Sequence, residues 1–276
     1  MATTAAQTRY RAEYIAGFEQ GAHQIRKTAT VEADIKGTSC VFLVADSGSA
    51  SAVTRGLNGR IPTRPDALAQ CTATLTEWHD IPERTDFNIY TSQGDGRRIM
   101  QMTSLKVMQR KIADDIITEL NTATQDTGTA VTADLKLTLY AKTILGVNKV
   151  PFDGNISALI TPAYQAYLMG VKEFANADYV NNKPFSGHLE SFSWMGINFI
   201  VYPELPGVGT NAEKCFMYHK DAIGHACDVE NLRVEIGYDE KQAYSWARTS
   251  AYMGSKILQN SGIVVINHDG SEFAAQ

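Results

Sequence analysis

The sequence has few cysteines, no long hydrophobic run and no apolar stretch near its first residues. Four cysteines in 276 residues are too few for a disulfide scaffold, and they favour a reducing compartment. The longest purely apolar run covers about six residues at positions 40–45, whereas a membrane-spanning helix needs about 20. The polar N-terminus predicts no secretory signal. These absences argue against a disulfide-rich secreted domain and against a helical membrane protein.

The chain also has no excess of basic residues. Its formal net charge is −5, from 25 Lys and Arg against 30 Asp and Glu. A basic face of the kind that binds nucleic-acid phosphates is therefore not expected. Hydrophobic residues make up 44% of the chain and charged residues 20%, which are ordinary values for a folded globular protein. The length suits one large domain or two small ones.

Enzyme motifs are missing as well. The sequence has no G-x-S-x-G nucleophile elbow and no H-E-x-x-H zinc motif. A Gly-rich turn at residues 93–98 precedes a predicted helix, but no Lys-Ser/Thr pair follows it, so an ordinary turn is favoured over a phosphate loop. Four residues have types that suit zinc, although their spacing is not that of paired ligands: Cys215, His219, His225 and Cys227. We therefore expect no cofactor, and a zinc-dependent enzyme is the most distant alternative.

The strongest helical pattern covers residues 97–124. Neither Pro nor Gly occurs from residue 97 to residue 127, so a helix of about 25 residues and about 37 Å is predicted. Apolar residues recur at spacings of three and four, which is typical of one buried helix face. They are Ile99, Met102, Leu105, Met108, Ile112, Ile116 and Leu120.

A long hairpin is predicted before this helix. Residues 41–44 are expected to form a short buried strand, and Asn58-Gly59 is a turn dipeptide. In residues 69–76 small apolar residues alternate with Gln and Thr, as in a strand with one apolar face. Because a two-stranded hairpin with so thin an apolar face is marginal in water, we expect it to need a partner surface.

The rest of the chain predicts a mixed α/β region without internal repeats. Helices are expected at residues 132–145 and 162–175, the second opened by a proline in its first turn. Strands are expected at residues 156–160, 188–192, 197–202, 214–219, 232–236, 244–253 and 262–267. Near the N-terminus, Tyr10, Tyr14 and Phe18 are spaced four apart, which permits a short amphipathic helix within residues 9–24.

The order of these elements, together with several short motifs, resembles a known family. The motifs are FEQG at residues 18–21, TVEADIKGTSCVF at 30–42, RGLNGRIP at 55–62, QRKIADDII at 109–117, AYMGSKIL at 251–258 and GIVVI at 262–266. Together they span nearly the whole chain. In this order they resemble the tailed-phage major capsid proteins of the Hong Kong 97 (HK97) type.

The resemblance implies an α+β fold of the HK97 type. Its parts would be an N-terminal arm, an extended hairpin loop, a long spine helix, a peripheral β-sheet domain and an axial α/β domain. The implied ranges are 1–36 for the arm, 37–90 for the hairpin with its flanking strands, 91–130 for the spine helix, 131–232 for the axial domain and 233–276 for the return to the peripheral domain.

The implied function is that of a major capsid protein, a structural protein without catalytic residues. Its copies would assemble as pentamers and hexamers into an icosahedral shell around phage double-stranded DNA. Other partners would be a portal protein and scaffolding or cement proteins, with no membrane involved. The location would be the virion, after assembly in the host bacterial cytoplasm. The alternative is an encapsulin-type nanocompartment shell, in which Tyr10, Tyr14 and Phe18 could supply a cargo-docking helix.

Charged residues of the hairpin and of the long helix predict how neighbouring subunits meet. Within residues 47–65 the charges are Arg55, Arg60 and Arg64, and we predict that they pair with carboxylates of a neighbouring chain. The candidate partners lie towards the end of the long helix: Asp114, Asp115 and Glu119. The sequence leaves the choice of carboxylate open. The arginines could instead only keep the loop soluble.

The hairpin also contains no lysine. No lysine occurs between Lys36 and Lys106. Some members of the HK97-type family join their subunits by a covalent Lys–Asn bond that uses a hairpin lysine. Because this hairpin cannot supply the amine, we predict a shell that is held together non-covalently.

Overall fold

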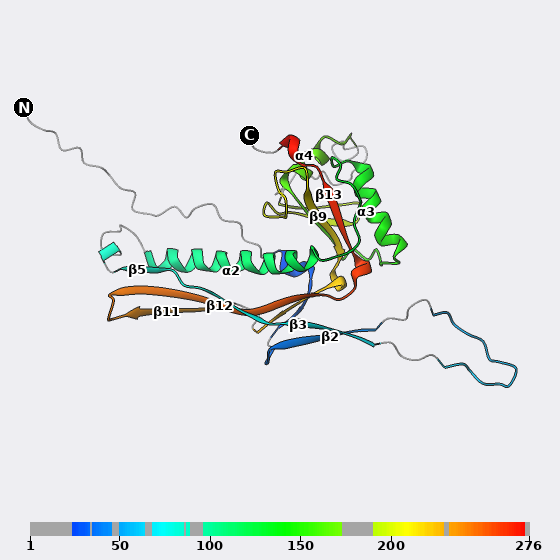
Figure 1. The fold of residues 1–276 in the computed structure, drawn as a ribbon, viewed down its shortest axis with the longest axis horizontal. Coiled ribbons are helices and arrows are strands. Elements are labelled where there is room, and N and C mark those ends of the chain that lie inside the picture. Colours follow the sequence, from blue (N-terminus) through cyan, green and yellow to red (C-terminus); the bar gives the residue numbers. More distant parts are fainter. Residues whose placement is uncertain are drawn as a thin grey trace, which may run out of the picture.

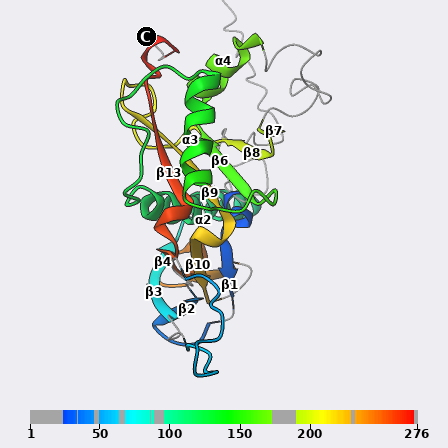
Figure 2. The same cartoon turned by 90° about the vertical axis from the view of Figure 1, so that its right-hand side faces the viewer.

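The structure is a computed structural model that describes residues 24–33, 35–45, 50–63, 68–85, 87–88, 96–172, 190–228 and 232–273. These residues form two sheets, each with helices packed against it, and one separate hairpin that projects from the body (Figures 1 and 2). The helix predicted within residues 9–24 lies outside the described residues, apart from Gln24. Within the described part of the chain, no helix is long and apolar enough to cross a membrane.

The first sheet is organised around one long strand. Its strands are β1 (Thr30–Glu32), β4 (Thr76–Asp80), β5 (Glu83–Thr85), β10 (Ile223–Cys227), β11 (Arg233–Asp239) and β12 (Tyr244–Ile257). β12 is 14 residues long and pairs antiparallel with β10, β11, β4 and β5. The short strand β1 pairs parallel with β10 and brings the first described residues to the edge of this sheet.

The predicted long helix is confirmed as α2 (Gly96–Leu120), which lies along β12 (Figure 1). Alternate residues of β12 are buried on the face toward the helix, where Ser104 Oγ donates a hydrogen bond to Thr249 Oγ1 at 2.8 Å. Met108 and Leu120 belong to the buried face of α2, as the periodicity predicts. The predicted apolar face includes Met102, but this side chain is 44% exposed, so the face is not buried at that position.

The second sheet contains several of the largest fully buried side chains, among them Tyr218, Phe199 and Phe216. Its strand order is β13 (Ile263–His268), β9 (Glu213–His219), β6 (Ile156–Ile160), β8 (Ile197–Val201) and β7 (Ser191–Trp194). β6 is buried along its whole length and pairs parallel with β8 and antiparallel with β9. β7 and β8 form a hairpin that turns at Met195-Gly196, where both residues have positive φ.

In the described part of the chain, two helices accompany the second sheet. α3 (Leu135–Val147) begins after Asp134, whose carboxylate accepts the backbone N–H of Leu137 at 2.6 Å. α4 (Pro162–Met169) begins with the expected proline but ends at Met169, earlier than the predicted residue 175. The short helix η2 (Lys220–Ala222) takes the chain from β9 of this sheet to β10 of the first. One hydrophobic core runs through both sheets.

The hairpin consists of β2 (Ser39–Ala45) and β3 (Leu68–Thr74), which pair only with each other (Figure 1). The prediction that residues 41–44 are buried is wrong, because only Phe42 is buried there. Val41 and Leu43 are 49% and 66% exposed. In a two-stranded ribbon only one face can pack against the body, so alternate side chains of β2 point to solvent.

Candidate functional site

The root of the hairpin is fixed to the first sheet by close packing. Phe42 forms a small buried cluster with Ala73 and Ala226. Its ring lies so close to Gly224 that a Cβ there would be 2.9 Å from Phe42 Cζ. Gly254 of β12 likewise lets the backbone at Thr74 come close, because a Cβ added to Gly254 would lie 2.1 Å from the carbonyl oxygen of Thr74. Small residues in β10 and β12 therefore allow the hairpin to pack closely against the first sheet.

The tip of the hairpin has no packing of its own. All residues described between 50 and 63 are exposed. The tip turns through hydrogen bonds from Gly56 N–H to Arg60 O at 3.1 Å and from Gly59 N–H to Gly56 O at 2.9 Å. Gly59 has a φ of 68°, which confirms the predicted Asn58-Gly59 turn. The loop is thus shaped by its backbone and gains no stability from burial.

Exposed apolar side chains on the tip were missed by the sequence reasoning. Val53, Leu57 and Ile61 are 57%, 109% and 59% exposed. They alternate with the two described arginines of the loop, Arg55 and Arg60. A projecting loop that combines large apolar groups with charges of one sign is a surface suited to contact with another chain. The signal was present in the sequence as V-x3-L-x3-I, but nothing there distinguishes exposure from burial.

The hairpin arginines have few contacts inside the chain. Arg55 Nη1 donates to Gly59 O at a long 3.5 Å. Among the ion pairs of the described residues, none includes Arg55 or Arg60. Arg64 lies outside the described residues. The predicted pairing with a carboxylate of a neighbouring chain therefore stays a prediction.

Two of the three candidate carboxylates on α2 bond within their own chain. Asp115 Oδ2 accepts a hydrogen bond from Ser255 Oγ at 2.6 Å, and burial raises the pKa of this carboxyl group although that bond opposes the rise. Glu119 Oε1 accepts from Lys256 Nζ at 2.9 Å and from the backbone N–H of Ile257 at 3.2 Å. Both residues thereby connect α2 to β12.

Asp114 is the third candidate and has a different setting. Its carboxylate accepts no hydrogen bond from any described residue. Burial raises the pKa of Asp114, and the nearby charge of Glu204 adds to the rise, while Lys111 and Arg110 oppose it. Arg110 Nη1 lies 3.6 Å from Glu204 Oε1. Asp114 is therefore the member of the trio that has no hydrogen bond to another described residue.

The four possible zinc ligands are not gathered into one site. Cys215 and His219 lie on β9 in the second sheet, whereas His225 and Cys227 lie on β10 in the first. Burial raises the pKa of the Cys215 thiol to about 12, and His219 Nε2 lies 3.1 Å from Asp153 Oδ1. Over the described ranges, no group of three or more His, Cys, Asp or Glu residues is placed to hold a metal ion.

These features define a structural, shell-type subunit: a long helix along a long-stranded sheet, a second α/β sheet at one end, and a projecting hairpin whose tip has no packing of its own. The family model described as "phage capsid protein" matches residues 2–270. The chain therefore belongs to the phage capsid protein family.

Solved structures agree with this assignment. A chain from Mycobacterium phage Che8 has a TM-score of 0.78 and 14% identity, with 96% of this chain and 98% of that chain covered. The capsid of a native GTA particle gives 0.74 and 15%, with 98% and 99% covered. The capsid of the cyanophage P-SCSP1u gives 0.69 and 13%, with 96% and 93% covered. No curated protein matches significantly. The resemblance to HK97-type capsid proteins is confirmed for family and fold.

Proposed function

We propose that this chain is the major subunit of an icosahedral phage shell, assembled from its copies as pentamers and hexamers around double-stranded DNA. The observation that carries the proposal is the hairpin, whose root is packed on the body while its tip exposes Val53, Leu57 and Ile61. The family match over residues 2–270 supports the same conclusion. A compact monomer gains nothing from such an extension, because a lone two-stranded ribbon is marginal in water.

The hairpin is proposed to lie on an adjacent subunit, with Arg55, Arg60 and Arg64 facing carboxylates there. Asp114 is the first candidate partner, because Asp115 and Glu119 already accept hydrogen bonds within the chain. One exposed ion pair contributes only about 0–1 kcal/mol. A closed shell repeats each contact in every subunit, so weak pairs act together through multivalency.

The finer features of the proposal rest on the resemblance to HK97-type capsid proteins together with the composition of the chain. The shell is held together non-covalently, since the hairpin has no lysine. Packaged DNA is contained by the wall and not bound in a sequence-specific way, because the subunit is acidic overall. The subunit has no catalytic role, it assembles in the host cytoplasm, and it works with a portal protein and with separate scaffolding or cement proteins.

Reversal of the loop charges tests the proposal. We expect the double variant R55E/R60E to give soluble, folded subunits that form no shells in negative-stain micrographs. Because both arginines are exposed, unfolding of the free subunit should change by less than about 0.5 kcal/mol. The matched control R55K/R60K keeps both charges and should assemble. Normal shells from R55E/R60E would refute the arginine pairing. The lack of any particles from the unaltered chain, expressed alone and together with a scaffolding protein, would refute the shell function itself.

A further inference from the structure

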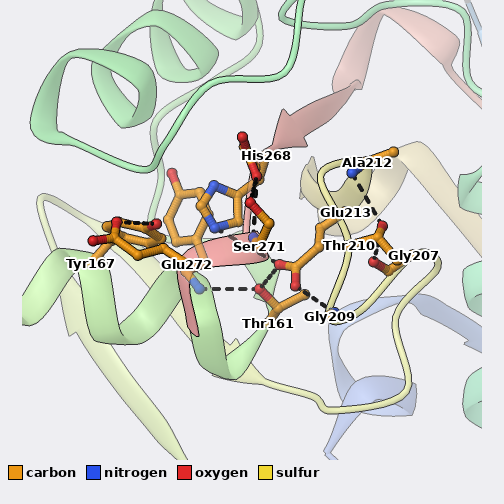
Figure 3. Close-up of polar contacts among 12 residues, drawn as sticks. Thr161, Tyr167, Gly207, Gly209, Thr210, Ala212, Glu213, His268, Ser271 and Glu272 are labelled. Carbon is orange, nitrogen blue, oxygen red and sulfur yellow. Dashed lines mark hydrogen bonds and ion pairs between the residues drawn. The ribbon is translucent and has the colours of Figure 1, made fainter. Parts of the chain in front are cut away.

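A polar cluster, drawn in Figure 3, lies where β9 begins and β13 ends. In Figure 1 this end of the second sheet is the one that points away from α2. Glu213, the first residue of β9, is the register partner of His268, the last residue of β13. Both side chains are fully buried, with His268 Nε2 3.8 Å from Glu213 Oε2. An ionisable pair with no exposure has to be held by its own surroundings, because solvent cannot stabilise its charge.

Glu213 holds two chain segments together. Its Oε2 accepts a hydrogen bond from Thr161 Oγ1 at 2.6 Å, and its Oε1 accepts from the N–H of Gly209 at 2.8 Å (Figure 3). A Cβ on Gly270 would lie 2.2 Å from Glu213 Oε1, so the C-terminal segment passes directly over the carboxylate. Gly270 N–H also donates to the carbonyl oxygen of Thr210 at 3.2 Å. Residues 207–212 and 268–273, which we call the clasp segments, are thus built around Glu213.

The surroundings of His268 favour the neutral form of its ring. The bond between its Nδ1 and the carbonyl oxygen of Val131, at 3.2 Å, requires the proton on Nδ1, because a carbonyl can only accept. Among the described residues, Nε2 has no hydrogen-bond partner. The rings of Tyr164 and Tyr167 meet the imidazole edge-on, with centroids 5.0 and 5.4 Å away. A second N–H on this ring would therefore enter a site without an acceptor within bonding distance.

The charges around His268 change its pKa less than its burial does. The titratable groups packed against it are Glu213 from β9, Asp269 from its own strand end, and the phenols of Tyr164 and Tyr167 from α4. Glu272, on the short helix η4 (Ser271–Phe273), accepts a hydrogen bond from Tyr167 Oη at 2.8 Å. Burial lowers the pKa of His268, although the bond to Val131 and the charges of Glu213 and Asp269 act in the opposite direction.

We propose that Glu213 and His268 form an acid-sensitive clasp that holds the two clasp segments closed at neutral pH and releases them on acidification. When the segments open, His268 becomes hydrated and binds a proton at its ordinary pKa of about 6.5. The closed form binds that proton only at a lower pH, so acid favours the open form. Stability from the clasp is present above about pH 6.5 and is lost as pH falls towards the lowered pKa. The inference goes beyond the shell function and does not depend on it.

Hydrogen exchange of the full-length subunit, followed by mass spectrometry, tests the clasp. After correction for the intrinsic pH dependence of exchange, opening of the clasp segments should rise up to about tenfold between pH 7.5 and pH 5.5. Peptides from the fully buried strand β6 serve as the internal reference and should show no comparable change. This comparison uses the unaltered chain and so needs no variant.

Two variants assign the effect to His268. H268N keeps an N–H where Nδ1 now donates to Val131, but it cannot titrate, so its clasp segments should lose the pH dependence. H79N removes the solvent-exposed His79 of β4 and should keep the full dependence. The clasp would be overturned if exchange of the clasp segments in the unaltered chain did not change with pH. It would also be overturned if H268N responded to pH as the unaltered chain does. Neither result bears on whether the chain forms shells, which micrographs decide separately.

Discussion

Removing the Phe42 ring should detach the hairpin from the body without unfolding the rest of the subunit. Phe42 is 7% exposed, and the cluster around it is separate from the main core. Phe→Ala substitutions in protein cores cost about 3–5 kcal/mol. For so small a cluster we take the lower end, about 3 kcal/mol, which corresponds to about a 150-fold rise in opening of β2 and β3.

A double-mutant cycle makes this estimate specific. G224A places a methyl group 2.9–3.1 Å from three ring carbons of Phe42, and this overpacking should cost about 1–2 kcal/mol. In F42A/G224A the same methyl occupies space that the ring has left. The double variant should therefore be less destabilised than the sum of the single variants, by at least about 1 kcal/mol.

Hydrogen exchange of β2 and β3 measures local opening, and negative-stain microscopy of the same variants measures assembly. The matched control is V41A on the adjacent position of the same strand. Val41 is 49% exposed, so its truncation should change local opening by about 0.5 kcal/mol or less. F42A should impair shell formation because the loop is no longer presented in a fixed direction. Equal effects of F42A and V41A, or strict additivity in the cycle, would show that the root is not held by this packing.

Two further predictions concern titration and covalent state. Burial, with a smaller effect from the charge of Arg26, lowers the pKa of His225 to about 4, so the free energy of unfolding should fall by about 3 kcal/mol as pH drops from 6.5 to 4. H225N should reduce that slope in denaturant titrations at several pH values, and an unchanged slope would contradict the assignment. Assembled particles boiled in detergent should run as one band near 30.2 kDa, since the hairpin has no lysine to form a cross-link. A ladder of larger bands would disprove the non-covalent shell.

Elements with a strong local pattern were predictable from the sequence. The long helix was predicted over residues 97–124 from apolar spacing, and α2 runs from Gly96 to Leu120, ending four residues before the predicted end. The turn at Asn58-Gly59 was read from its dipeptide. β10 was not predicted, because Ile223–Cys227 contains Gly, His and Ala, which have little strand preference of their own. Its extended form comes from pairing with β1 and β12, and these partners are distant in the sequence.

Sites that depend on register could not be read from the sequence. The pairing of His268 with Glu213 could not be predicted, because the two residues are 55 positions apart and meet only through the pairing of β9 with β13. The zinc candidates show the reverse case, because Cys215, His219, His225 and Cys227 are close in the sequence but lie in two different sheets. The short helix η2 separates them by taking the chain from one sheet to the other after His219. The exposure of Val41 likewise follows from which face of the ribbon rests on the body.

The direct passage of β3 into β4 determines how the subunit carries tension. Only Leu75 separates the two strands, and β4 is hydrogen-bonded along β12 from Thr76 to Asp80. A neighbour that pulls on the loop therefore draws β4 lengthwise past β12 (Figure 1). Loaded in shear, the bonds of this ladder share the force and must break together, whereas a ribbon peeled sideways would lose them one at a time. The molecule is thus strongest along the direction in which its extended loop reaches outward.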